Sequence, residues 1–350
     1  MKKIIEDIFN TWNEDIDFSG VFSASDAGGV LFQYAAGHRN RAEELLNTVD
    51  TAFGIASGTK LFTGLAVCKL IDEGKLSLES KLWDVLPGRD LGRIDKGVTI
   101  HQLLTHTSGV GDYIDEEAED ADAQLEALYH NYPCYLWTQM DYYLQMIAPL
   151  PPKFEPGARY AYSNAGFVLL GLVVEAVSGM PYQQYMRENV ITKVGEHSSP
   201  LRHTGFYRMD SLPANTALGY MEDEDSGEWR TNIFSLPIIG GSDGGIYTCA
   251  ADMDKLWRAI VANRILSQAM TQTLLSRQVV IDEEDGESYG LGVYLYEDDG
   301  KLAYFAVGGD TGVGFCTAYY PKTGVAMSCF SNTGWMGFYD LIGEMLEVLG

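Results

Sequence analysis

Several features typical of membrane, secreted and disulfide-stabilised proteins are missing from this sequence of 350 residues. It has no apolar run of 18 or more residues without charges, so a membrane-spanning helix is not expected. Its N-terminus turns acidic at Glu6 and Asp7 before an apolar run builds up, unlike a signal peptide. The five cysteines are an odd number without close pairs, which does not indicate a disulfide framework. These absences predict a cytoplasmic protein.

Positive charge is also scarce. Lys and Arg number 24 against 49 Asp and Glu, a formal net charge of −25. A surface so acidic repels phosphate, so neither nucleic acid nor an anionic membrane is expected as a partner. The acidic segments 115–122, 222–225 and 282–285 lack the ligand spacing of a calcium loop, and we interpret them as solvated loops. The six histidines show no metal-binding spacing. We therefore expect no metal and no cofactor, a small-molecule substrate as partner, and leave the oligomeric state open.

The content of 46% hydrophobic and 21% charged residues is typical of a soluble globular enzyme. Strand-like segments gather at both chain ends and a helical middle lies between them. The predicted strands are 21–24, 30–34, 289–296, 302–307, 315–320 and 325–331, with helices near 4–13 and 337–349. Short turns between successive strands favour antiparallel pairing. We predict an α/β (α+β) fold in one catalytic domain, 1–350. Its antiparallel sheet is flanked by helices, and a mainly helical subdomain of roughly 57–200 is inserted between 1–56 and 201–350.

Residues 56–74 read as a buried helix with a candidate nucleophile at its start. Its apolar positions follow a spacing of three or four and a glycine ends it: Leu61, Leu65, Cys68, Ile71 and Gly74. Ser57 lies in the first turn, and the i, i+3 spacing places Lys60 on the same face. A serine hydroxyl needs a base within about 2.6–3.2 Å. Lysine is such a base only if burial or the helix macrodipole lowers its pKa. Alone, Ser-x-x-Lys is a weak motif, and an N-capping serine with a surface lysine is then its commoner interpretation.

A second candidate element is Tyr162-Ser163-Asn164, which precedes an apolar run over 165–174. Ser163 or Asn164 is expected to cap a buried helix that ends at 178–179. A tyrosine hydroxyl ahead of this helix could exchange protons with Ser57 and Lys60, and nearby positive charge would favour its ionisation. Asn164 could donate to a substrate carbonyl. The alternative for Tyr162 is a packed core tyrosine.

Together, Ser57-Gly58-Thr59-Lys60 and Tyr162-Ser163-Asn164 resemble the motifs of the serine β-lactamase and DD-peptidase superfamily. The tyrosine form resembles its class C branch, which includes family VIII carboxylesterases and D-amino-acid peptidases. Segments 99–109 and 240–253 are similar to further family signatures, and the resemblance runs from about residue 20 to the end. It implies a β-lactamase/transpeptidase-like fold. Ser57 would be the nucleophile and Lys60 the base for acylation. Tyr162 would protonate the leaving group and activate water. His106 is expected to be structural.

The third motif departs from the family pattern. It is commonly Lys-Thr-Gly or His-x-Gly before a turn and Gly-Phe, but residues 306–315 read Ala-Val-Gly-Gly-Asp-Thr-Gly-Val-Gly-Phe. Counting places Gly308, or Val307 after a one-residue insertion, at the cationic position. The segment Val-Gly-Gly is similar to the Trp-Gly-Gly of some esterase members. The substrate contacts expected here are Gly308, Gly309, Asp310 and Thr311. An N–H near Thr311 would complete an oxyanion hole with that of Ser57.

These features predict a serine hydrolase that acts through an acyl-Ser57 intermediate on esters or small amides. The missing cation removes a charge-assisted hydrogen bond to an anionic substrate, worth about 1.5–3 kcal/mol. A β-lactamase or D-amino-acid (DD-) peptidase is the alternative within enzymes, with Arg159 as the first candidate to bind a carboxylate. A penicillin-binding-like protein with a slow or inactive site is the non-enzyme alternative. The aromatic residues of 129–143 either line an acyl pocket or pack in the core.

Overall fold

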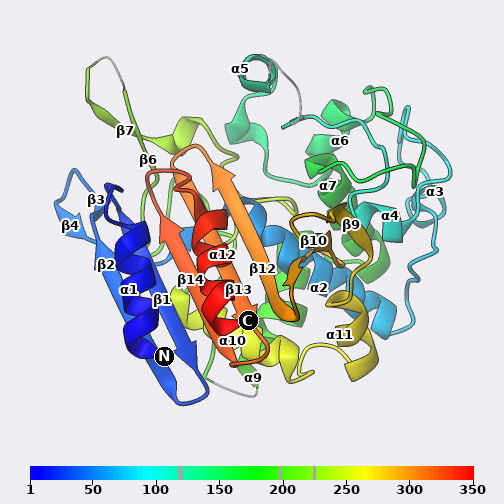
Figure 1. The fold of residues 1–350 in the computed structure, drawn as a ribbon. Coiled ribbons are helices and arrows are strands. Elements are labelled where there is room, and N and C mark those ends of the chain that lie inside the picture. Colours follow the sequence, from blue (N-terminus) through cyan, green and yellow to red (C-terminus); the bar gives the residue numbers. More distant parts are fainter. Residues whose placement is uncertain (117–120, 197–198, 224–225) are drawn as a thin grey trace.

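An eight-stranded antiparallel sheet forms the centre of the molecule (Figure 1). The computed structural model describes residues 1–116, 121–196, 199–223 and 226–350. The strand order is β2-β1-β14-β13-β12-β11-β10-β9, so strands from the two chain ends meet where β1 pairs with β14. The strands span Gly20–Asp26 (β1), Gly29–Ala36 (β2), Val279–Asp282 (β9), Glu287–Tyr289 (β10), Tyr294–Asp298 (β11), Lys301–Asp310 (β12), Val313–Tyr320 (β13) and Val325–Ser331 (β14).

The two terminal helices, α1 (Lys2–Trp12) and α12 (Phe338–Leu349), cover one face of the sheet (Figure 1). Both are amphipathic, so each buries one apolar stripe against the strands. Ile5 and Phe9 of α1 belong to the same buried cluster as Phe22 of β1. Because β-strand side chains alternate between faces, the sheet also contributes apolar residues to a second, larger cluster on its other face.

Helices α2 (Thr59–Asp72) and α7 (Asn164–Ser178) form the centre of this second cluster and are buried nearly all round. The predicted caps of α7 are confirmed: Ser163 accepts from the Gly166 N–H at 3.0 Å, and Gly179 ends the helix in the left-handed region. The other helices are α3 (Leu82–Val85), α4 (Ile100–Leu104), α5 (Ala121–Asn131), α6 (Asp141–Ile147), α8 (Tyr182–Met186), α9 (Thr192–Glu196), α10 (Ala250–Val261) and α11 (Gln268–Leu274). Short strands pair outside the main sheet: β3 (His38–Asn40), β4 (Leu45–Leu46), β5 (Phe53–Gly54), β6 (Tyr220–Glu222), β7 (Trp229–Thr231) and β8 (Tyr247–Thr248).

The predicted strand 289–296 is wrong in one respect, because the structure divides it into β10 and β11. The turn between them packs against α2. A Cβ added to Gly64 of α2 would lie 2.3 Å from the carbonyl oxygen of Leu291, and Gly292 has φ +89°. Two glycines thus let the turn lie directly on the helix. Strand β9 was not expected; it is only four residues long, and it lies at the sheet edge with its side chains alternately half-buried and exposed.

Of the acidic segments, residues 283–286 form an exposed turn between β9 and β10. Parts of the other two, 117–120 and 224–225, lie outside the described residues. No single helix in the described ranges is long and apolar enough to cross a membrane. The bent pair Asn164–Ser178 and Tyr182–Glu196 reaches that length and hydropathy together. All five cysteine thiols are free and buried.

Candidate active site

The candidate nucleophile Ser57 lies in a tight turn rather than in the helix that follows it. The turn is a short 3₁₀ segment, Ala56–Gly58 (η1), immediately before α2. Ala56 has φ +42°, an uncommon conformation for a residue with a side chain. Thr59 Oγ1 stabilises it by donating to the Ala56 carbonyl at 2.8 Å and accepting from the Ile246 N–H at 3.1 Å. The turn therefore presents Ser57 at the surface of an otherwise buried segment.

Lys60 is buried and makes three hydrogen bonds through Nζ. Its partners are Ser57 Oγ at 2.9 Å, Asn164 Oδ1 at 2.7 Å and the backbone carbonyl of Asp243 at 2.8 Å. Burial lowers the pKa of the Lys60 ammonium, while nearby carboxylates, that of Asp243 first among them, oppose the shift. In the neutral amine, the two N–H groups match the two carbonyl acceptors, and the lone pair is left for the serine hydroxyl.

Tyr162 lies against both residues. Its hydroxyl is within hydrogen-bonding reach of Ser57, and Lys60 Nζ lies 4.7 Å from the centre of its ring. Burial and then the negative charge of Glu116 raise the pKa of the Tyr162 phenol well above its usual value. The expectation that nearby positive charge favours its ionisation is therefore wrong. Tyr162 is a phenol, and thus a proton donor, in this environment.

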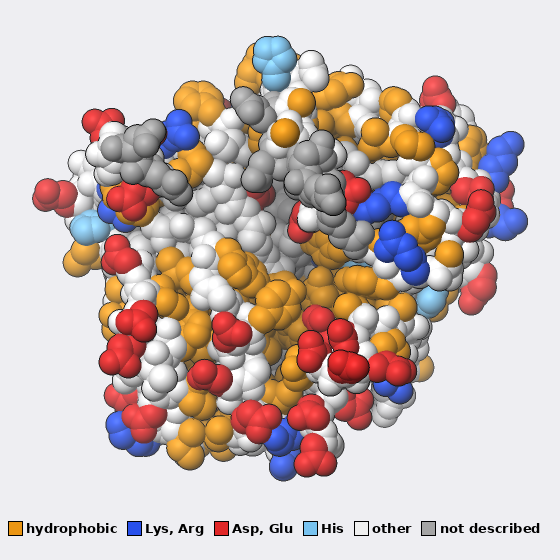
Figure 2. Space-filling view, turned by 45° about the horizontal axis from the view of Figure 1, so that its top comes forward, with side chains coloured by type: hydrophobic (Ala, Val, Ile, Leu, Met, Phe, Trp, Pro, Cys, Tyr) orange, Lys and Arg blue, Asp and Glu red, His pale blue; other side chains and the backbone are white. Residues whose placement is uncertain are grey.

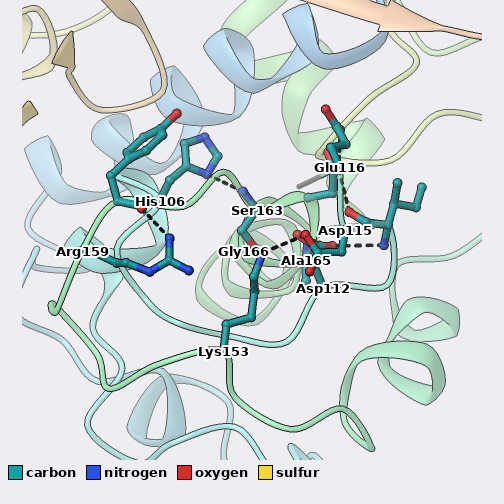
Figure 3. Close-up of polar contacts among 12 residues, drawn as sticks. His106, Asp112, Asp115, Glu116, Lys153, Arg159, Ser163, Ala165 and Gly166 are labelled. Atoms are coloured by element: carbon teal, nitrogen blue, oxygen red, sulfur yellow. Dashed lines mark hydrogen bonds and ion pairs between the residues drawn. The ribbon is translucent and has the colours of Figure 1, made fainter. Parts of the chain in front are cut away.

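Asn164 connects Lys60 to an acidic side chain that the sequence did not single out. Its Oδ1 accepts from Lys60, and its Nδ2 donates to Glu116 Oε1 at 2.8 Å. In the structure Nδ2 therefore donates to Glu116 and does not point into the open space where a substrate carbonyl would lie. Asp112 stabilises the start of α7 by accepting from the Ala165 N–H at 3.1 Å (Figure 3).

His106 lies beneath the loop that carries Tyr162. The two ring centres are 4.6 Å apart, and Figure 3 shows the imidazole directed at Ser163. Burial and then the charge of Lys60 lower the pKa of His106 well below its usual value, so the ring is neutral. A neutral, buried ring agrees with the structural role that we expect for His106.

The pairing of β12 with its two neighbours decides to which side its last backbone amides point. Two-residue turns at 299–300 and 311–312 join β12 to its neighbours. In such hairpins the residues flanking the turn form a hydrogen-bonded pair, as does every second pair beyond it. Phe305 therefore directs its N–H toward β11. Because Gly309 lies four residues further along β12, its N–H points to the same side. Since β11 pairs with β12 no further than Phe305, the Gly309 N–H points past its end into the cleft.

This arrangement corrects two expectations. The Thr311 N–H donates to Asp310 Oδ1 at 2.8 Å, so Gly309 is the better oxyanion-hole donor. Gly308 cannot be a position for a cationic side chain, because a Cβ there would lie 2.1 Å from the Ile55 carbonyl oxygen and 2.9 Å from the Ser57 nitrogen. Val307, by contrast, does line the cleft.

Figure 2 shows the cleft as a hollow near the centre of one face of the molecule. Most of the predicted site residues line it: Ser57, Tyr162, Asn164, Gly308, Gly309, Asp310 and Thr311. Lys60 lies below the surface and reaches the cleft through Ser57. Arg159 is not among the lining residues. It is exposed and stacks over Phe154, with its guanidinium 4.5 Å from the ring centre.

Two participants escaped the sequence analysis, Glu116 and Asp243. Glu116 lies within an acidic segment taken for a solvated loop, and Asp243 within a glycine-rich segment noted for the family resemblance alone. Both are lining residues of the cleft. Of the aromatic residues in 129–143, Tyr129 lines the cleft whereas Trp137 is fully buried in the core. Among the side chains that the structure describes, no three His, Cys, Asp or Glu are grouped as a metal site would require.

Comparison with known proteins agrees with this geometry. The family model described as Beta-lactamase matches residues 9–340. A penicillin-binding protein of Bacillus halodurans has a solved structure with a TM-score of 0.86 and 41% identity, covering 98% of this chain and 99% of that one. A D-stereospecific amidohydrolase from Streptomyces sp. has a TM-score of 0.80 at 23% identity, covering 99% of both chains, which shows a shared fold.

Among curated proteins, Penicillin-binding protein 4* of Bacillus subtilis is 27% identical over 310 residues. The match covers 86% of this chain but only 64% of that protein. The family match extends over nearly the whole chain, and the serine, lysine and tyrosine that define the cleft occur in the order that the motifs require. This chain is a member of the Beta-lactamase family of serine hydrolases.

Proposed function

We propose that the protein hydrolyses esters or small amides by transferring the acyl group to Ser57 and then to water. The observation that carries the proposal is the 2.9 Å contact between Lys60 Nζ and Ser57 Oγ. The two carbonyl partners of Lys60 occupy the N–H groups of a neutral amine, which directs its lone pair at the serine proton. Its lowered pKa favours that neutral form.

In the acylation step, Ser57 Oγ attacks the substrate carbonyl carbon as its proton passes to Lys60. The N–H groups of Ser57 and Gly309 receive the negative charge that develops on the carbonyl oxygen. Tyr162, a neutral phenol, gives its proton to the departing alcohol or amine and regains one from Lys60. In deacylation a water molecule loses its proton to the same pair, its oxygen attacks the acyl carbon, and Ser57 Oγ leaves with the proton.

A second candidate is slow turnover of penicillin-like ligands, which the names of the Bacillus relatives favour. Such a protein would acylate at Ser57 and release the acyl group slowly. The cleft argues for a weaker interaction with these anionic ligands, because position 308 holds a glycine and Val307 is uncharged.

The test combines labelling with turnover. A fluorophosphonate probe should add one adduct mass to the intact chain, on the peptide that contains Ser57, and none to Ser57→Ala. In a panel of p-nitrophenyl esters, nitrocefin and D-alanyl peptides, we expect multiple turnovers with neutral short-chain esters. A label on another serine would overturn the mechanism. A single burst with nitrocefin and no ester turnover would select the second candidate.

A further inference from the structure

A second hollow lies apart from the catalytic cleft, where α10 and α11 meet the sheet at β12 and β13. With its open mouth it measures about 1060 Å³, at the upper end of the range for small-molecule sites, about 300–1,000 Å³. It shares none of its described lining residues with the hollows that open at Ser57. The mechanism at Ser57 therefore leaves this hollow without a role.

Neutral polar side chains form its helical wall. Gln268, Thr271 and Gln272 are spaced i, i+3 and i+4 along α11, so they share one face of that helix. Asn263, in the turn after α10, also lines the hollow. Within the described ranges the protein offers no hydrogen-bond partner to these four side chains. Thr271 is only 5% exposed, and buried hydroxyls normally have partners, so its Oγ1 is left to bond to an occupant of the hollow.

Two tyrosines form the wall made by the sheet. Tyr304 of β12 and Tyr319 of β13 are directly opposite in the antiparallel pairing, so their side chains lie side by side on one face. Trp257 stacks on the Tyr319 ring, with ring centres 6.1 Å apart and planes inclined by 23°. Trp257 is itself fully buried, and its Nε1 donates to Thr317 Oγ1 at 2.8 Å. The two half-buried tyrosine rings thus form an aromatic wall supported from the core.

The hollow is uncharged. Although charged residues make up 21% of the chain, none is among the described residues that line it. A phosphate, carboxylate or ammonium group is therefore not the feature recognised here, because such groups bind through charge-assisted hydrogen bonds. The remaining lining is also neutral and mostly apolar: Val261, Leu275, Ser276 and Pro321. The matching ligand is neutral, with an apolar face and a polar rim.

From this lining we infer that the hollow is a second binding site, for a neutral carbohydrate. A pyranose ring has a face of C–H groups, which packs on a tyrosine ring, and hydroxyls around its edge. Each side-chain amide offers both donors and an acceptor, so Asn263, Gln268 and Gln272 match adjacent hydroxyls that do the same. The inference concerns a site separate from Ser57 and does not depend on the proposed function.

The test measures binding to the intact protein by saturation-transfer difference spectroscopy. The probes are three neutral trisaccharides, cellotriose, mannotriose and chitotriose, with adenosine as a neutral compound that also stacks on aromatic rings. We expect saturation on the ring C–H protons of at least one trisaccharide. No transfer to any of the three at about 10 mM, well above the millimolar affinity expected of so open a site, overturns the inference. A response to adenosine alone would overturn it in favour of a nucleobase.

Variants locate the binding. Tyr304→Ala and Gln272→Leu should each weaken the affinity for the bound trisaccharide by about 10-fold, the scale of one stacking contact or one hydrogen bond. The control is Tyr135→Ala, which removes a tyrosine that is 60% exposed elsewhere on the surface. An equal loss in the control would mean that exposed aromatic rings bind the sugar without specificity. Unchanged affinity in both hollow variants would place the sugar elsewhere, and either result overturns the inference.

Two readouts separate this site from the catalytic cleft. Ester turnover should be the same in Gln272→Leu as in the wild type, which also shows that the variant is folded. Labelling of Ser57 with the fluorophosphonate should leave the affinity for the trisaccharide unchanged. Loss of sugar binding on labelling would place the sugar in the catalytic cleft and overturn the inference.

Discussion

The Nδ1 atom of His106 accepts a hydrogen bond from the backbone N–H of Ser163 at 3.0 Å. The His106 carbonyl oxygen also accepts from the Ala161 N–H at 2.9 Å. One residue thus holds the backbone on both sides of Tyr162. His106 has φ +57°, a conformation that few residues with side chains adopt, so the surrounding structure maintains it. His106 is a positioning residue for Tyr162.

Replacement of His106 should therefore separate activity from stability. In His106→Ala we expect kcat on a neutral ester to fall by about 10- to 100-fold, since small misplacements of a catalytic group have effects of this size. His106→Asn tolerates the positive φ and offers an Oδ1 acceptor for the Ser163 N–H, so it should recover part of the loss. The measurements are kcat and melting temperature. If Asn and Ala variants with equal melting temperatures have equal kcat, the positioning role is wrong.

Removal of either proton-transfer group should lower turnover without unfolding the protein. Lys60→Ala and Tyr162→Phe should each reduce kcat by about 100-fold or more, the scale of general acid–base catalysis. Tyr162→Phe removes one hydroxyl from a half-buried ring, so its melting temperature should change little. Near-native rates in both variants would contradict the assigned roles. A large fall in the melting temperature of Tyr162→Phe would instead favour a core tyrosine.

The pH profile should report Lys60. Its folded-state pKa lies below the usual lysine value, and the neutral amine is the active form. Therefore kcat/KM on an uncharged ester should be lost as pH falls through this lowered pKa, and should reach a plateau above it. Lys60→Arg supplies the matched control, because guanidinium stays protonated and cannot act as a base. If Lys60→Arg kept the wild-type rate and the same loss of kcat/KM at low pH, that loss would have to come from another titrating group.

Adjacent glycines in β12 should respond differently to the same substitution. A Cβ on Gly308 meets backbone of the nucleophile turn at 2.1 Å, whereas on Gly309 the nearest atom is in the Trp335 ring at 3.3 Å. Gly308→Ala should destabilise the fold by about 1–3 kcal/mol, as overpacking does, and displace Ser57. Gly309→Ala should fold normally. Urea unfolding and ester turnover measure the two effects, and equal stability of both variants would contradict this packing.

A histidine can be accommodated at Val307, which lines the cleft, but not at Gly308. Val307→His places an ionisable group near Glu116 and Asp310. We expect the ratio of nitrocefin to neutral-ester kcat/KM to rise by about 10-fold at pH 6, and less at pH 8, because only imidazolium attracts a carboxylate. Competition assays with both substrates at the two pH values measure the ratio. A gain that is independent of pH would point to shape instead of charge.

The sequence alone was sufficient where the chemistry depends on local spacing. Ser57 and Lys60 are three residues apart, and although Ser57 lies in the 3₁₀ turn that leads into α2, the i, i+3 spacing still brings them into contact. The caps of α7 likewise follow from short signals, a serine and a glycine. The antiparallel pairing of β12 with β13 was also expected, but the two-residue turn at 311–312 was not, because the predicted strands stopped at 307 and resumed at 315. The order of the motifs along the chain was enough to indicate the family.

Tertiary structure decided what spacing cannot encode. The carbonyl of Asp243 that helps to fix the Lys60 amine is 183 residues away in the chain. Glu116 and Asp310 come from an acidic segment and a strand end that have no sequence relation, yet they share one cleft wall. That β11 leaves the N–H side of Gly309 uncovered became visible only once β11 was seen to begin at Tyr294, and so to pair with β12 no further than Phe305. The burial of the site residues, the charge around them and their hydrogen bonds all depend on residues that are distant in the sequence. Only the folded chain brings those residues together.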